Sequence, residues 1–198
     1  MPPFRAGSGY LLRVGKAVRV LLAALLCASS LMTRAVEDRI ERPENEIKAA
    51  FLYKFLGFVE WPAGAFASPA APLVVGVIGS DDIAARLQQM VPGHPVLGHP
   101  VVIRNLKSHG ESLEGLHALY IGRSENAWLD NLAERAQQLS VLTVAEATDG
   151  IDYGCVINFL LDEGRVRFDV SMEAAQLGKL TLSSRLLAVA HRVKSGAR

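Results

Sequence analysis

The stretch Leu73-Val74-Val75-Gly76-Val77-Ile78, followed by Gly79-Ser80-Asp81-Asp82, indicates the fold class of this chain. The first six residues are almost continuously apolar, which is typical of a strand buried on both faces of a parallel sheet. The next four residues turn the chain and offer a cap for a short helix with apolar residues at Ile83, Leu87 and Met90. A buried strand that leads directly into a helix is the repeating unit of an α/β protein.

The same alternation continues along the chain. Buried strands are expected at 101–106, 118–122 and 141–144, with a helix at 125–139 before the last of them. After residue 150 the pattern changes to two strands, 156–161 and 166–170, joined by a short connection that contains glycine and is typical of a hairpin. The sequence therefore predicts an α/β/α sandwich: a largely parallel central sheet with antiparallel C-terminal strands and helices on both faces.

Helices are also expected at both ends of this pattern. Apolar residues fall at helical spacing after residue 44, at Ile47, Phe51, Phe55 and Phe58. The proline at 62 disfavours helical geometry at Trp61 and is expected to end the helix there. We expect this wide aromatic stripe in the core, with a dimer interface as the alternative. A final helix is expected over 183–193.

Residues 1–35 have the features of a secretory signal peptide. A basic stretch without any acidic residue precedes an apolar run at 20–28, and a cleavage-like Thr33-Arg34-Ala35 follows. The apolar run is shorter than the roughly 20 residues that span a bilayer. An uncleaved anchor and a lipoprotein signal are the alternatives. We expect residues 36–43 to be a tether and residues 44–195 to be one exported domain.

Removal of the signal peptide changes both the charge and the cysteine content of the chain. The full chain has 21 basic and 20 acidic residues, but five of the basic residues lie within 1–35, so the remainder has a net charge near −4. A mildly acidic domain without a basic cluster argues against nucleic acid as a partner. Cys27 leaves with the signal peptide, and Cys155 remains as a single thiol that cannot form an intramolecular disulfide.

No motif in the sequence predicts catalysis or a cofactor. The turn after the strand at 73–78 lacks the three-glycine spacing of a dinucleotide site. The four histidines between positions 94 and 117 lack the spacing of metal ligands and are expected to be solvated loop residues: His94, His99, His109 and His117. The sequence therefore predicts no metal, no cofactor and no enzyme, and an unrecognised hydrolase has only dispersed polar residues in its support.

Two further candidates for chemistry have structural explanations. Cys155 follows a glycine at the start of an apolar strand, which indicates a buried and inert thiol. Ser183 and Ser184 stand where a helix is expected to begin, and we expect them to cap it.

Several blocks of the sequence, in order behind the export signal, resemble the YfiR-like family of small periplasmic proteins of Gram-negative bacteria. The resemblance runs from about residue 46 to residue 193. Its blocks are 47–55, 59–62, 75–79, 97–101, 142–144, 154–159, 166–170 and a closing motif made of 174–175, 177–180 and 183–187. The chain departs from many relatives in having Cys155 in place of glycine and Ser171 in place of asparagine. It also lacks the cysteine pairs of some relatives, so redox gating is not expected.

The resemblance implies regulation through protein contact in the periplasm. The best-known relatives bind the periplasmic sensor domain of an inner-membrane diguanylate cyclase and hold it inactive, and an outer-membrane lipoprotein can sequester the regulator. We therefore expect a non-enzymatic repressor of cyclic-di-GMP signalling that can form a homodimer. In the family the C-terminal strand–helix region contributes to partner contact, which on this chain corresponds to Asp169, Met172, Ala175, Leu180, Thr181, Ser183, Ser184 and Leu187.

Two alternatives accompany this expectation. Leu180 and Leu187 could simply cover the sheet rather than contact a partner. The domain could also be a small-ligand-binding module that uses the crevice at the strand ends near Gly79 and Gly122.

Overall fold

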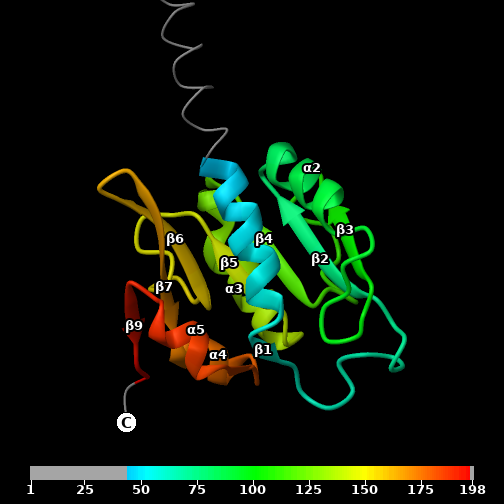
Figure 1. Ribbon diagram of the computed structural model, residues 1–198. Coiled ribbons are helices and arrows are strands. Elements are labelled where there is room, and N and C mark those ends of the chain that lie inside the picture. The colour runs from blue at the N-terminus through cyan, green and yellow to red at the C-terminus, as the bar shows by residue number, and fades with distance from the viewer. Residues whose placement is uncertain (1–43, 197–198) are drawn as a thin grey trace, which may run out of the picture. The chain divides into compact units, whose positions relative to one another are not determined.

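The apolar run at 73–78 forms strand β2 (Leu73–Ile78) of a seven-stranded sheet in the computed structural model, which describes residues 44–196. Strand β2 pairs in parallel with β3 (Val101–Asn105) and with β4 (Ala118–Ile121). Parallel pairing continues through β5 (Leu142–Ala145) to β6 (Ile157–Asp162) (Figure 1). The predicted signal peptide at 1–35 and the tether at 36–43 lie outside the described residues.

The C-terminal part of the sheet reverses direction through a hairpin. Strand β7 (Arg165–Ser171) pairs antiparallel with β6, and the loop between them is Glu163-Gly164. Both loop residues have positive φ angles, 48° and 73°, as a type I′ turn requires. The last strand, β9 (Arg192–Lys194), pairs in parallel with β7 and completes the order β3-β2-β4-β5-β6-β7-β9.

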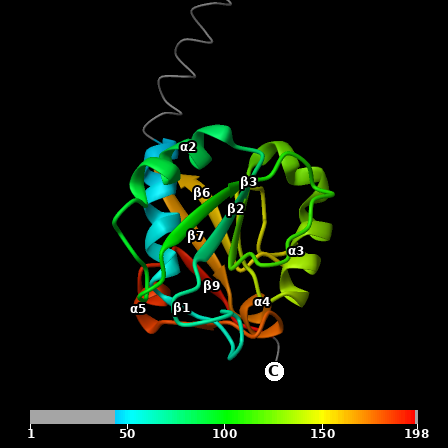
Figure 2. The same cartoon turned by 90° about the vertical axis from the view of Figure 1, so that its right-hand side faces the viewer.

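Helices cover both faces of this sheet (Figure 2). A helix at 44–56 and α2 (Asp81–Met90) bury Val75 and Val77 of β2 on one face, while α3 (Leu129–Gln138) buries Ile78 on the other. Because both faces are covered, β2 is apolar along its length instead of alternating. The predicted α/β/α sandwich, with a largely parallel sheet and antiparallel C-terminal strands, is confirmed.

The 44–56 helix ends five residues earlier than the sequence predicted. It stops before Gly57, whose N–H donates to Lys54 O at 3.0 Å, and the chain then forms β1 (Val59–Glu60). Strand β1 pairs antiparallel with β8 (Thr181–Leu182) in a separate two-stranded ladder. The helix predicted at 125–139 begins as a 3₁₀ helix, η1 (Arg123–Trp128), and becomes α-helical in α3.

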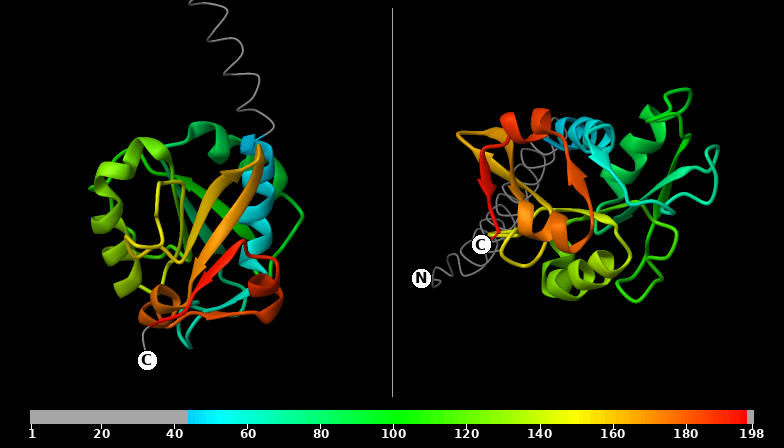
Figure 3. Two further views of the ribbon diagram at one scale, coloured as in Figure 1. Left: turned by 90° about the vertical axis from the view of Figure 1, so that its left-hand side faces the viewer. Right: turned by 90° about the horizontal axis from the view of Figure 1, so that it is seen from below.

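The prediction of a final helix over 183–193 is wrong. Helix α5 (Ser184–Ala188) is short, and the following residues form β9 at the edge of the sheet (Figure 3). The edge of β7 offers free backbone groups, and the N–H of His191 donates to Phe168 O at 2.8 Å. A short helix that the sequence did not predict, α4 (Met172–Leu177), lies between β7 and β8.

The aromatic stripe of the 44–56 helix belongs to the core of the domain. Phe51 and Phe55 contact Phe159 of β6 and Phe168 of β7, with ring centroids 4.8–6.3 Å apart. None of the helices in the described part of the chain combines the length and the apolar character needed to cross a bilayer.

Candidate functional site

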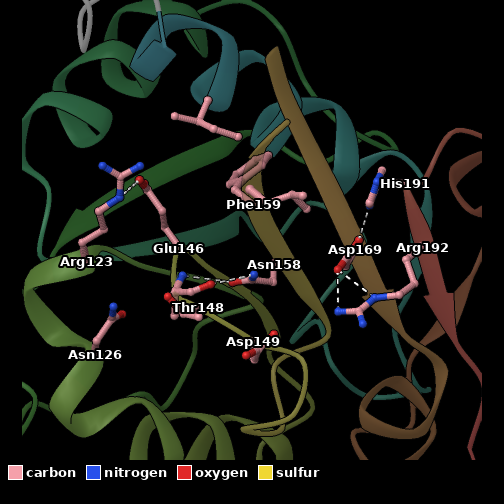
Figure 4. Close-up of a pocket in the computed structure, with 13 residues that line it drawn as sticks. Arg123, Asn126, Glu146, Thr148, Asp149, Asn158, Phe159, Asp169, His191 and Arg192 are labelled. Carbon is pink, nitrogen blue, oxygen red and sulfur yellow. Dashed lines mark hydrogen bonds and ion pairs between the residues drawn. The ribbon is translucent and has the colours of Figure 1, made fainter. Parts of the chain in front are cut away.

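A cleft of about 560 Å³ opens at the carboxyl ends of β4 and β5, beside β6 and β7 (Figure 4). Arg123 comes one residue after the glycine that follows β4, and Glu146 comes directly after β5. The carboxyl ends of parallel strands meet at one edge of the sheet, so these two side chains lie together. Residues of β6, β7 and β9 form the opposite wall of the cleft.

One wall of the cleft is backed by a buried cluster of charges. Lys48 of the 44–56 helix is 2% exposed, and its Nζ lies 2.6 Å from Glu146 Oε1 and also pairs with Glu44. Arg123 pairs with Glu146 through Nε and with Glu44 through Nη2, at 3.1 Å for the second pair. Each buried charge is therefore compensated, as burial requires.

Tyr120 completes this cluster from strand β4. Its hydroxyl donates to Glu146 Oε2 at 2.6 Å. Burial and the adjacent Glu146 carboxylate raise the pKa of Tyr120, so the hydroxyl remains a donor at neutral pH. The Lys48–Glu146 cluster, defined as Glu44, Lys48, Tyr120, Arg123 and Glu146, thus fastens the 44–56 helix to the ends of β4 and β5.

A second group of ion pairs forms the opposite wall. Asp169 of β7 is buried and accepts from His191 Nδ1 at 3.0 Å and from Arg192 Nη2 at 2.8 Å. Its cross-strand neighbour Asn158 bonds both backbone groups of Ala147, at 2.9 and 3.1 Å, and so holds the loop after β5 against β6. These contacts shape the floor of the cleft.

The cleft presents hydrogen-bond donors rather than acceptors at these two walls. The carboxylates of Glu146 and Asp169 are buried and engaged by their partners. Arg123 and Arg192 are more than half exposed, and each spends only part of its five N–H donors on those carboxylates. Across residues 44–196, no three His, Cys, Asp or Glu side chains come together in a way that could hold a metal ion.

The crevice that the sequence placed at Gly79 and Gly122 is closed by backbone contact. The N–H of Gly122 donates to Ile78 O at 2.8 Å, and a Cβ on Gly122 would overlap the carbonyl group of Gly79. The ligand-sized cleft lies further along the sheet, at the carboxyl ends of β4 and β5 and beside β6 and β7. Gly79 and Gly122 therefore allow the ends of β2 and β4 to pack closely and do not line a ligand site.

The histidines do not form one site. His94 is exposed as expected, whereas His109 stacks on Trp128 with ring centroids 3.8 Å apart. His117 is 6% exposed, so the prediction of a solvated loop residue is wrong for it. Phe66 stacks on the ring of His117, with the ring centroids 4.2 Å apart.

Two predictions about single residues are confirmed. Cys155 is fully buried, and burial raises the pKa of its thiol to about 12. Ser183 caps α5, where its Oγ accepts from the N–H of Arg185 at 3.3 Å.

Comparison with known proteins identifies the family of this domain. A model of the YfiR/HmsC-like family matches residues 45–191. The chain belongs to the YfiR/HmsC-like family. Membership supports, in general terms, the expected role of a periplasmic regulator.

Two solved structures are similar to this YfiR/HmsC-like protein. It is similar to a conserved domain protein from Vibrio cholerae O1 biovar El Tor at 13% identity and a TM-score of 0.51, over 76% of this chain and 60% of that one. An ABC domain in complex with L-Trp from Streptococcus pneumoniae has 12% identity and a TM-score of 0.44, over 61% of this chain and 55% of that one. The chain thus spans less than two thirds of either protein. No curated protein matches it.

The partner-binding residues expected for a YfiR/HmsC-like protein occupy three environments. Asp169, Ala175 and Leu180 are buried, and Asp169 belongs to the wall of the cleft. The remaining residues lie on α4, β8 and α5 and are half-buried (Met172, Ser183 and Leu187) or exposed (Thr181 and Ser184).

The expected set omits two apolar side chains that the same YfiR/HmsC-like segment exposes. Leu177 at the end of α4 is 61% exposed, and Val189 just after α5 is 64% exposed. The sequence did not indicate that Leu177 and Val189 are exposed, because an apolar residue at the end of a short helix is usually assigned to the core. Exposed apolar groups among polar neighbours are typical of an interface.

Proposed function

We propose that this protein is a non-enzymatic periplasmic regulator that binds the sensor domain of an inner-membrane diguanylate cyclase and represses cyclic-di-GMP synthesis. The observation that carries the proposal is the exposure of Leu177 and Val189 in the C-terminal segment of a YfiR/HmsC-like domain. We assign contact with the partner to the surface formed by α4, β8 and α5, which we call the C-terminal surface, residues 172–189.

The residues of this surface divide into contacts and supports. Direct contact with the partner is assigned to the exposed residues Leu177, Thr181, Ser184 and Val189 and to the half-buried residues Met172, Ser183 and Leu187. Ala175 and Leu180 lie in the core, where they hold α4 and β8 in place. Truncating a buried residue would reduce binding through the stability of the fold rather than through a lost contact.

The test is a pull-down of the cyclase sensor domain, combined with measurement of cellular cyclic-di-GMP. Leu177→Glu and Val189→Glu should abolish capture of the sensor domain and raise cyclic-di-GMP to the level of a gene deletion. Val102→Glu is the matched control, because Val102 is also exposed but lies on β3 at the opposite edge of the sheet. Unchanged cyclic-di-GMP in the deletion, together with no cyclase captured, would refute the proposal.

Two further partners complete the proposal. An outer-membrane lipoprotein would compete with the cyclase for the regulator, which a competition pull-down measures. A homodimer would use a surface other than the aromatic stripe, because Phe51 and Phe55 pack against β6 and β7 of the same chain. Light scattering of the mature chain gives its oligomeric state.

The cleft supports a second candidate function, the binding of a small anionic ligand. Arg123 and Arg192 present unused N–H donors from opposite sides of the cleft, with Thr148 and Asn158 between them (Figure 4). A thermal-shift screen of small carboxylates would detect such a ligand by its increase of the melting temperature. The double variant Arg123→Gln/Arg192→Gln should lose that increase, and an increase that survives in the variant would exclude this cleft.

A further inference from the structure

The loop at 61–72, between β1 and β2, is docked against the amino ends of the sheet by two histidines. The Phe66 ring stacks on His99 at a centroid distance of 3.9 Å and on His117 at 4.2 Å. Rings stacked this closely on both histidines place Phe66 between them. His99 Nδ1–H also donates to Ala71 O at 2.7 Å.

The hydrogen bonds of His117 fix its protonation state. The backbone N–H of Val74 donates to its Nδ1 at 3.1 Å, so that nitrogen must carry a lone pair. The proton of the neutral ring is then on Nε2, which donates to Ala65 O at 3.2 Å. His117 thus joins the 61–72 loop to the first residues of β2 only in its neutral form.

We propose that His117 makes the 61–72 loop an acid-sensitive latch. A proton on Nδ1 removes the acceptor for the Val74 N–H and places two N–H groups against each other. His99 does not have this conflict, because its Nδ1 already carries a proton and keeps its bond to Ala71 when the ring is charged. The sensitivity therefore resides in His117, and the loop is released when this ring is protonated.

The surroundings of His117 disfavour a charged ring in the closed loop, so protonation favours release of the loop. Burial lowers the pKa of His117 below its ordinary value of 6.5, and His99 on the other side of Phe66 acts in the same direction, against the opposing hydrogen bond to Ala65. Among the described residues, no carboxylate pairs with either imidazole. The His117 ring is therefore harder to protonate while the loop is closed than when the loop is open. Opening becomes up to tenfold more favourable per pH unit below about 6.5, until the closed form is also protonated.

Release of the loop would reach the C-terminal surface through Trp61. Trp61 Nε1–H donates to His117 O at 2.9 Å, and Trp61 directly follows β1. Strand β1 in turn pairs with Thr181 and Leu182 of β8. The consequence for partner binding rests on the proposed function, whereas the latch itself does not.

The experiment follows the emission maximum of Trp61 as the pH falls from 7.5 to 4.5. The sequence has two tryptophans, so Trp128→Phe leaves Trp61 as the single tryptophan. We expect a shift to longer wavelength with its midpoint below pH 6.5. His117→Asn in this background should abolish the shift, because the asparagine Oδ1 can accept from Val74 N–H and does not titrate. His94→Asn, at an exposed loop histidine, should leave the shift unchanged.

Two outcomes would overturn the latch: no shift in the parent, or the same shift in His117→Asn. If His117→Asn does not fold, NMR of the unmutated chain decides, because the Val74 amide resonance must move with the His117 titration and a stationary amide refutes the latch. Capture of the cyclase sensor domain at pH 7.5 and pH 5 tests the coupling separately. Equal capture at both values, with the fluorescence shift intact, refutes the coupling and leaves the latch and the proposed function standing.

Discussion

Replacement of Lys48 by methionine tests whether the Lys48–Glu146 cluster stabilises the fold. The change keeps the length of the side chain but removes a cation that is 2% exposed and paired with Glu44 and Glu146. Loss of one partner from a buried ion pair costs about 3–5 kcal/mol. Arg123 still pairs with both carboxylates, but its side chain is 56% exposed and its compensation is screened by solvent. We expect a loss at the lower end, about 3 kcal/mol.

The measurements are urea unfolding and thermal unfolding of the chain at pH 7, both monitored by circular dichroism. In a domain of this size the loss should lower the melting temperature by roughly 6–12 °C. Lys54→Met is the matched control on the exposed side of the same helix and should leave the midpoint unchanged. Adding Glu146→Gln to Lys48→Met should cost less than the sum of the single changes, since one of the two carboxylates that lost Lys48 is then replaced by a neutral amide. A loss below about 1 kcal/mol, or strict additivity, would refute the reasoning.

Three other changes test separate features of the fold. In a folded Cys27→Ser chain, Cys155 should resist a thiol reagent at pH 8 because burial raises its pKa to about 12; mass spectrometry should detect labelling only in urea. Gly122→Ala should lower the melting temperature because its Cβ would overlap the carbonyl of Gly79, and an unchanged value would contradict the close packing. Glu163→Asn should stabilise the hairpin by up to about 0.5 kcal/mol in urea unfolding, because asparagine tolerates the φ of 48° at this position better than glutamate; destabilisation would contradict the turn assignment.

The strands of the sheet could be predicted because each is indicated by a short run of apolar residues in its own part of the sequence. Strand β2 has the bounds that its apolar run indicated, and burial on both faces explains why the run does not alternate. The C-terminal end could not be predicted in the same way. Leu186, Leu187 and Ala190 have helical spacing, but the hydrogen bond between His191 N–H and Phe168 O depends on the neighbouring edge of β7. A local pattern carries no information about an open edge elsewhere in the sheet.

The candidate site was only partly visible in the sequence. Arg123 and Glu146 each come just after a buried strand, a position that places side chains at the carboxyl edge of a parallel sheet. Lys48 stands among apolar residues four positions after Glu44, and this pairing on a buried helix face is the signal that sequence reasoning missed. The pairing of Asp169 with Arg192 could not be predicted, since it depends on β9, which the sequence assigned to a helix.

The β1–β8 ladder determines how much of the C-terminal surface can respond to acid. It contains two residue pairs, Val59↔Leu182 and Glu60↔Thr181, and a ladder this short has little stability of its own. The buried side chains of Val59 and Leu182 anchor it in the core, while Trp61 attaches its end to the carbonyl of His117. Helix α4 is anchored independently, because Ala174 and Ala175 pack directly into the core. The proposed partner contacts Thr181 of β8 as well as α4, so its affinity should fall when the latch opens, although the contacts made by α4 persist.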